Sequence, residues 1–356
     1  MNRLIQLIKQ EWKYFWQLNP HHRPWSLPVA STIASGIPLL IGAYFGHMGY
    51  GLTSSLGGMA FLYLPNTSLL HRMVSLMTAC TAMAACFFCG LVLHFYPLFF
   101  VPGITLLAIG ITMLCRSLRV QPPGSLFFLM AAMIAVYMPH TVEQVPLYLG
   151  LLTAGGLWAC VVGLGYSLFR LWRGAGYDVT PDIERDFKLV VVDSLIIGTF
   201  IGISALVAQL SGLSRPYWVP VACIAVIQGI NFRAVWSKQL HRIAGTLGGM
   251  VLSFYLLSLP LNAWGICLVM MSLSFIIESL VARHYAAAVI FITPLTIFLA
   301  EAGAGMDAPV REIIEARMID TVVGSVIGCV GGWCLHQLNL RDKLADWLYG
   351  WRKGRV

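Results

Sequence analysis

Residues 72–94 read RMVSLMTACTAMAACFFCGLVLH and carry one charged side chain, Arg72, at their first position. An apolar run of this length is long enough to cross the ~30 Å hydrocarbon layer of a membrane as an α-helix. Similar runs recur along the whole chain of 356 residues, in which 58% of the side chains are apolar and 11% are charged. Soluble domains carry about 25% charged residues. The sequence therefore predicts an all-α integral membrane protein.

The apolar runs are separated by Pro, Gly and charged residues, and they predict about twelve transmembrane helices in two groups of six. The first group, residues 26–170, has its runs at 26–46, 51–65, 72–94, 98–115, 124–139 and 146–169. The second group, residues 191–338, has its runs at 191–211, 216–230, 242–259, 262–281, 285–300 and 317–338. An even number of spans per group inserts both groups in the same orientation, so we expect two parallel six-helix repeats.

Three polar segments flank these groups. We assign residues 1–25 to an amphipathic cytoplasmic segment, residues 171–190 to a cytoplasmic linker and residues 339–356 to a basic cytoplasmic tail. With the N-terminus in the cytoplasm, all Lys and Arg residues lie on the cytoplasmic side except Arg215, Arg311 and Arg317. This distribution follows the positive-inside rule and predicts a multi-pass protein of the bacterial inner membrane with both termini in the cytoplasm.

Several classes of function are disfavoured by what the sequence lacks. It has no Walker A motif, dinucleotide-binding fingerprint, zinc-protease motif or nucleophile elbow, so we expect no enzyme, no cofactor and no metal site. The basic residues stand singly at the ends of apolar runs, which indicates topology rather than nucleic-acid binding. The nine cysteines lie in or beside apolar runs, where cysteine acts as a small apolar residue. We therefore disfavour a redox or metal role for the Cys86–Cys89 pair.

Ionisable residues within or beside the spans are the first candidates for function, because charge in a membrane is costly. Arg72 and Arg242 open the third run of their groups, each directly after a histidine, His71 or His241. A guanidinium fork holds a carboxylate through two parallel hydrogen bonds, so both arginines are candidate substrate-binding residues. The alternative is that both are topology anchors whose side chains extend to the interface.

The last run carries a second kind of candidate. Asp320 follows Arg317 by three residues, so the two share a helix face and could form either a titratable gate for protons or a static ion pair. Glu278, near the end of the run at 262–281, is a further proton-coupling candidate, with pairing at the interface as the alternative.

Aromatic and amide side chains stand in the short eighth run. Tyr217 and Trp218 open it, where a planar substrate entering from outside would stack on their rings; an interfacial aromatic belt is the alternative. Gln228 lies later in the same run and would hydrogen-bond either a ligand or a neighbouring helix. The short second run of each group, 51–65 and 216–230, indicates where a substrate path would lie.

Small residues recur at three- and four-residue spacing in the second group. They are Gly245, Gly248, Gly249 and Gly324. Such spacing lets helix backbones approach closely in a membrane, so we assign these residues to helix packing.

The motifs of the second group carry a family resemblance. Residues 215–221 (RPYWVPV), Gln228, residues 239–249 (QLHRIAGTLGG) and residues 317–324 (RMIDTVVG) resemble the fusaric acid resistance protein-like family. The resemblance covers about residues 191–338 and adds Thr246 to the packing group. The first group shares the six-run layout but keeps only His71–Arg72 of these motifs.

The resemblance implies an inner-membrane transporter that exports small organic anions, often aromatic carboxylates, and is driven by the proton gradient. Membrane lipids, the anion and protons would be its partners, with a periplasmic adaptor in some relatives. Dimerisation is left open by the sequence. Two rival functions also stand: a passive organic-anion channel like the plant malate channels, and a scaffold of the envelope that transports nothing.

Overall fold

A computed structural model describes most of the chain. The described residues are 24–174, 176, 187–213, 215–228, 232–301 and 310–350. Residues 1–23 of the predicted N-terminal segment, most of the predicted linker and residues 351–356 of the predicted tail lie outside these residues. Within them the regular structure is entirely helical.

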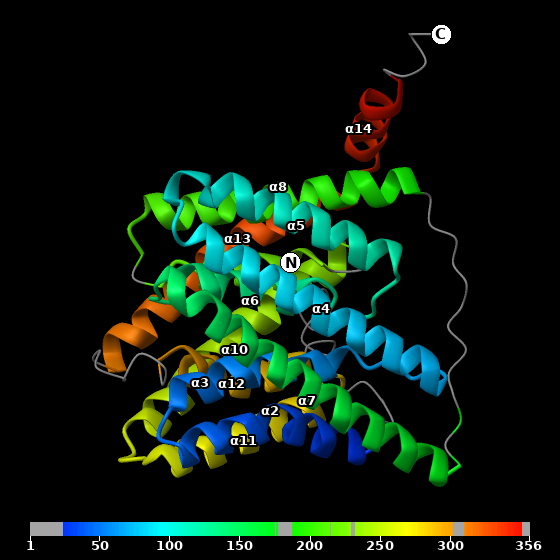
Figure 1. Ribbon diagram of the computed structural model, residues 1–356. Helices are drawn as coiled ribbons and strands as arrows, with labels where there is room; N and C mark the ends of the chain where they lie inside the picture. The colour runs from blue at the N-terminus through cyan, green and yellow to red at the C-terminus, as the bar shows by residue number, and fades with distance from the viewer. Residues whose placement is uncertain are drawn as a thin grey trace, which may run out of the picture.

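The helices follow the predicted runs in order (Figure 1). The first half contains α2 (Ser26–Tyr44), α3 (Met48–Gly58) continued by the 3-10 helix η1 (Met59–Tyr63), α4 (Leu69–Leu93), η2 (Pro97–Phe99), α5 (Phe100–Ser117), α6 (Leu126–Tyr137), η3 (Val142–Gln144) and α7 (Val145–Trp172). The second half contains α8 (Phe187–Leu210), α9 (Trp218–Ile227), α10 (Phe232–Leu257), α11 (Ala263–Leu280), α12 (Tyr285–Glu301), α13 (Val310–His336) and α14 (Leu338–Gly350).

Helix lengths agree with a membrane protein. In the described part of the chain, eight helices are long and apolar enough to cross a membrane: α2, α4, α5, α7, α8, α10, α11 and α13. The apolar helices α6, α9 and α12 are shorter, and α3 has 11 residues. The structure is therefore that of an all-helical membrane protein, while crossing by twelve helices stays a prediction.

The same helix pairs pack together in the two halves. In the first half α3 packs on α7 and α4 packs on α6; in the second half α9 packs on α13 and α10 packs on α12. The halves also exchange contacts, since α5 packs on α8 and α2 packs on α11, at opposite edges of the bundle (Figure 1). Both first helices are followed by a glycine with positive φ, Gly46 after α2 and Gly212 after α8, where a side chain would be strained.

Glycines lie at the contacts of corresponding helix pairs in the two halves. A side chain at Gly155 of α7 would meet the backbone oxygen of Ser54 in α3, and one at Gly324 of α13 would meet that of Val219 in α9. Small residues thus bring corresponding helix pairs together in each half, as expected where lipid supplies no hydrophobic driving force between helices.

Two helices begin earlier than the apolar runs predict. Helix α10 begins at Phe232, well before Arg242, and α13 begins at Val310, before Arg317. Charged residues end an apolar run but do not end a helix, because Lys, Arg and Glu are good helix formers. At the start of α13, Arg311 and Glu315 support the helix through an i,i+4 ion pair with Nε–Oε1 at 2.7 Å. Arg242 and Arg317 consequently lie inside their helices and not at the ends.

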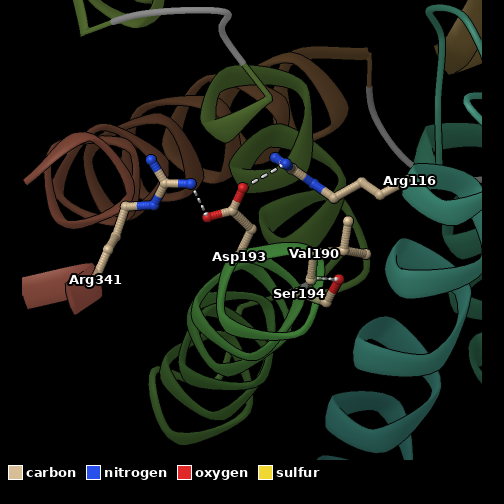
Figure 2. A network of polar contacts seen from close by, with 5 residues as sticks. All are labelled: Arg116, Val190, Asp193, Ser194 and Arg341. Atoms are coloured by element: carbon tan, nitrogen blue, oxygen red, sulfur yellow. Dashed lines mark hydrogen bonds and ion pairs between the residues drawn. The ribbon is translucent and has the colours of Figure 1, made fainter. Parts of the chain in front are cut away.

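The predicted tail also begins as a helix, and an ion pair of Arg341 holds it to the bundle. The Asp193 carboxylate in α8 lies between two guanidinium groups, 2.6 Å from Arg116 of α5 and 2.9 Å from Arg341 of α14 (Figure 2). Asp193 is buried, so the two arginines provide its charge compensation. One carboxylate therefore links the first half, the second half and the C-terminal helix.

Candidate functional site

Four of the predicted site residues gather where α9, α10 and α13 pack together. Their relative exposures are 3% for Trp218, 7% for Arg242, 4% for Arg317 and 0% for Asp320. We call these four residues the buried charged cluster. It contains two positive groups and one carboxylate, so an ionised cluster carries a net positive charge among membrane helices.

Arg317 is the central residue of the cluster. Its guanidinium carbon lies 3.8 Å from the centroid of the Trp218 ring, in a cation–π contact. Its Nη2 donates a hydrogen bond of 3.1 Å to Oγ1 of Thr296 in α12. Nε and Nη1 have no hydrogen-bond partner among the described residues. Three helices thus fix this guanidinium while part of its donor capacity stays unused.

Asp320 lies one turn along α13 from Arg317 but does not pair with it directly. Neither carboxylate oxygen has a hydrogen-bond partner within the described ranges. The positive charges that act on Asp320 are those of Arg317 and Arg215, and Arg242 in turn repels Arg317. The sequence-based option of a static Arg317–Asp320 ion pair is therefore wrong for this conformation, because Arg317 is turned toward Trp218 and Thr296.

Nε of Arg242 also has no hydrogen-bond partner in the described part of the chain. Arg242 thus adds a second partly unsatisfied guanidinium to the cluster. A buried polar atom without a partner costs free energy. The cluster therefore offers unused donors on two arginines and unused acceptors on one aspartate.

The aromatic pair differs from its sequence-based description. Trp218 is buried and one face of its ring is covered by Arg317, so it presents no open face to a substrate arriving from outside. Tyr217 is half-buried beside it, with ring centroids 5.1 Å apart, and reaches Tyr137 of α6 at 5.8 Å. Tyr217 therefore joins the cluster to the first half of the molecule.

The remaining predicted residues lie outside the cluster. Arg72 is buried in the first turn of α4 and donates a hydrogen bond of 2.6 Å to Oδ1 of Asn66. Gln228 follows α9 and donates a hydrogen bond of 2.8 Å to Oγ of Ser125, at the start of α6. Glu278 is half-buried near the C-terminal end of α11. Their predicted roles stay predictions.

The small residues lie at helix contacts around the cluster. On α10, Gly245 faces the backbone oxygen of Ala286, and Gly248 and Gly249 face Ile290, both on α12. Thr246, on the same helix, is buried. Gly324 of α13 faces α9. The helices that supply the cluster thus approach each other through small residues.

Thr296 and Arg215 were missed as site residues by the sequence-based reasoning. Arg215 begins the RPYWVPV motif, but the positive-inside rule placed it among the few arginines outside the cytoplasm, so it was not taken as a site residue. Thr296 stands in an apolar run and gave no signal, because only the packing of α12 brings its hydroxyl to Arg317. No group of three or more His, Cys, Asp or Glu residues suited to a metal occurs in the described ranges.

Comparison with known proteins bears on the second half most directly. Residues 202–331 match the family described as fusaric acid resistance protein-like. The chain is also 22% identical to the uncharacterized membrane protein YvaC of Bacillus subtilis (strain 168), over 492 aligned positions that cover 97% of this chain and 77% of the relative. No solved structure matches. The segment that holds the buried charged cluster thus matches the fusaric acid resistance protein-like family, which its motifs resemble.

Proposed function

We propose that this membrane protein exports small organic anions, and that the buried charged cluster is its anion site. The observation that carries the proposal is a pair of arginines, Arg242 and Arg317, that are more than nine-tenths buried and have hydrogen-bond donors without partners. Structures rarely leave such groups unpaired. A carboxylate entering the cluster would accept hydrogen bonds from these donors and neutralise the excess positive charge.

Aromatic carboxylates are the class that we assign to this site. Trp218 borders the guanidinium of Arg317 and Tyr217 lies beside Trp218, so one end of the site suits an anion and the other suits a ring. A substrate ring would replace the guanidinium of Arg317 on Trp218, while the substrate carboxylate would hold the guanidinium. The same exchange would open and close the site.

Asp320 is the proton-coupling residue of the proposal. Its carboxylate is fully buried and its oxygens lack hydrogen bonds within the described structure. Protonation would remove a buried negative charge. A proton on Asp320 and an anion on Arg317 would therefore both change the net charge of the buried charged cluster. Proton movement and anion movement can be coupled only if they act on a shared quantity of this kind.

For this function we propose a twelve-span scaffold of two parallel repeats. The repeated pairings α3–α7 with α9–α13 and α4–α6 with α10–α12 are those expected of a duplicated six-helix unit. The inner membrane of a bacterium, with both termini in the cytoplasm, is the location that we propose from the distribution of basic residues.

Flux in vesicles that contain the purified protein tests the proposal. Aromatic and aliphatic carboxylates would be offered with and without a proton gradient, comparing the wild type with Arg317→Gln and Asp320→Asn. Matched controls are Arg311→Gln and Glu315→Gln, because this pair lies on the same helix with exposed side chains. We expect gradient-driven flux in the wild type and both controls, and loss of accumulation in the two cluster variants.

Other outcomes would support a rival. Flux that ignores the gradient and survives Asp320→Asn would indicate a passive channel. The burial of the cluster argues for a carrier, because an open pore would leave its charges hydrated. Absence of flux for every carboxylate, together with a cellular phenotype that depends on residues 339–356, would favour a scaffold.

A further inference from the structure

Helices α4 and α7 bring two thiols together near the middle of the first half. Sγ of Cys80 lies 3.7 Å from Sγ of Cys160, and Sγ of Cys80 also lies 3.2 Å from the backbone oxygen of Gly156, to which its S–H donates. The two cysteines are separated by 80 positions in the sequence. From the sequence, every cysteine was interpreted as a small apolar residue, and this pair was not predicted.

The helix packing allows the two sulfur atoms to come closer. A disulfide requires about 2.05 Å between its sulfur atoms, so the thiols need to approach by somewhat less than 2 Å. Gly156 lies one turn before Cys160 on the same face of α7, and a Cβ there would stand 3.3 Å from both Cβ and Sγ of Cys80. The missing side chain therefore lets α4 come close to α7 at the level of the thiols.

The surroundings indicate which kind of oxidant reaches the pair. Both cysteines are partly exposed and lie near the middle of helices long and apolar enough to span a membrane. Their neighbours Met77 on α4 and Leu157 and Val161 on α7 are exposed, with relative exposures of 58%, 59% and 59%. This surface faces the hydrocarbon layer if the helices span it, so an oxidant dissolved in the lipid has direct access.

We propose that Cys80 and Cys160 form a membrane-embedded dithiol that a lipid-soluble quinone oxidises to a disulfide. Two S–H bonds break and one S–S bond forms. The two electrons and two protons that leave the thiols reduce the quinone to its hydroquinone. The disulfide fixes α4 against α7.

The test uses the full-length protein in membrane vesicles and tetramethyl-1,4-benzoquinone, a quinone without a free ring carbon for thiol addition. Free thiols are blocked with N-ethylmaleimide in denaturant, disulfides are reduced, and the released thiols are labelled with polyethylene glycol maleimide. We expect two labels per wild-type chain, at Cys80 and Cys160 in a peptide map. Cys80→Ser and Cys160→Ser should each remove both labels, whereas the control Cys329→Ser, a partly exposed cysteine of α13, should keep them.

Parallel oxidation with copper(II)–phenanthroline separates geometry from reactivity. If neither oxidant joins Cys80 to Cys160 in the wild type, the proposal is overturned without reference to any variant. A disulfide with copper–phenanthroline alone overturns the assignment of a quinone as oxidant. Disulfides that join two chains, or that involve other cysteines at equal yield, also contradict the proposed pair.

Discussion

The two halves of this protein share their helix packing and differ in their charges. In the first half, α3–α7 and α4–α6 pack as α9–α13 and α10–α12 do in the second. Yet α13 holds Arg317 and Asp320 in its buried interior, whereas residues 145–152 at the start of α7 (VPLYLGLL) contain no charged side chain. One half supplies the charges of the candidate site, and the other supplies a similar scaffold without them.

The paired arginines illustrate the difference most clearly. Arg72 and Arg242 each follow a histidine in the sequence. Arg72 lies in the first turn of α4 with Asn66 as an acceptor, while Arg242 lies well inside α10, within electrostatic range of Arg317. Asn66 accepts a hydrogen bond from one donor of the Arg72 guanidinium, while the positive charge of Arg317 near Arg242 favours an added anion. We therefore expect the same dipeptide to serve different purposes in the two halves.

The largest expected effect concerns the paired arginines, Arg72 and Arg242, and tests whether the two halves differ in function. We predict that Arg242→Gln lowers carboxylate flux about 100-fold, because loss of a charge-assisted contact of about 3 kcal/mol corresponds to two factors of ten. Arg72→Gln should lower flux at most about tenfold, through looser packing at Asn66. The measurement is flux at matched protein abundance in vesicles. Equal losses in the two variants would refute the functional asymmetry of the halves.

The sequence predicted the scaffold better than the site. The apolar runs predicted where each helix from α2 to α13 lies, because the length of an apolar run decides whether a helix can cross the hydrocarbon layer of the membrane. The structure brings four of the candidate residues together, Trp218, Arg242, Arg317 and Asp320, but the sequence did not predict their geometry, and their roles stay predictions. Rotation of Arg317 toward Trp218 and Thr296 depends on side-chain packing between three helices, which no spacing in one helix encodes.

A second prediction tests the shared scaffold with matched glycines. A methyl group at Gly90 of α4 would meet the backbone oxygen of Ala132 in α6, and one at Gly245 of α10 would meet that of Ala286 in α12. We expect Gly90→Ala and Gly245→Ala each to lower the free energy of unfolding by about 1–3 kcal/mol, since the facing atoms belong to rigid backbone.

Thermal unfolding in detergent measures these losses. The control is Gly110→Ala on α5, where nothing lies within 4 Å of an added Cβ, so stability should be unchanged or slightly higher. Similar losses at Gly90 and Gly245 would sharpen the equivalence of α4–α6 and α10–α12. A loss of stability in one half alone would show that the packing of α4 on α6 and of α10 on α12 does not contribute equally to the free energy of unfolding.

A third prediction concerns the connection between the halves. Asp193→Asn removes the negative charge between Arg116 and Arg341, and we expect a loss of about 1–3 kcal/mol in the free energy that docks α14. Proteolysis should then cut α14 faster in the variant than in the wild type. Asp342→Asn, a neighbouring carboxylate on α14, is the control. Unchanged proteolysis would mean that apolar contacts of α14, such as those of Leu344 and Ala345, suffice to dock it.

The smallest expected effect belongs to the exposed ion pair at the start of α13. Arg311 and Glu315 have side-chain exposures of 86% and 57%, and a pair so open to its surroundings contributes at most about 0.5 kcal/mol. Arg311→Gln should therefore leave thermal stability and carboxylate flux nearly unchanged, although it lies fewer than two turns from Arg317. If Arg311→Gln instead reduces flux as strongly as Arg317→Gln, surface attraction of anions at this end of α13, and not binding in the buried charged cluster, would explain the need for arginine. Increasing salt distinguishes the two, because screening weakens attraction at an exposed charge far more than binding at a buried one.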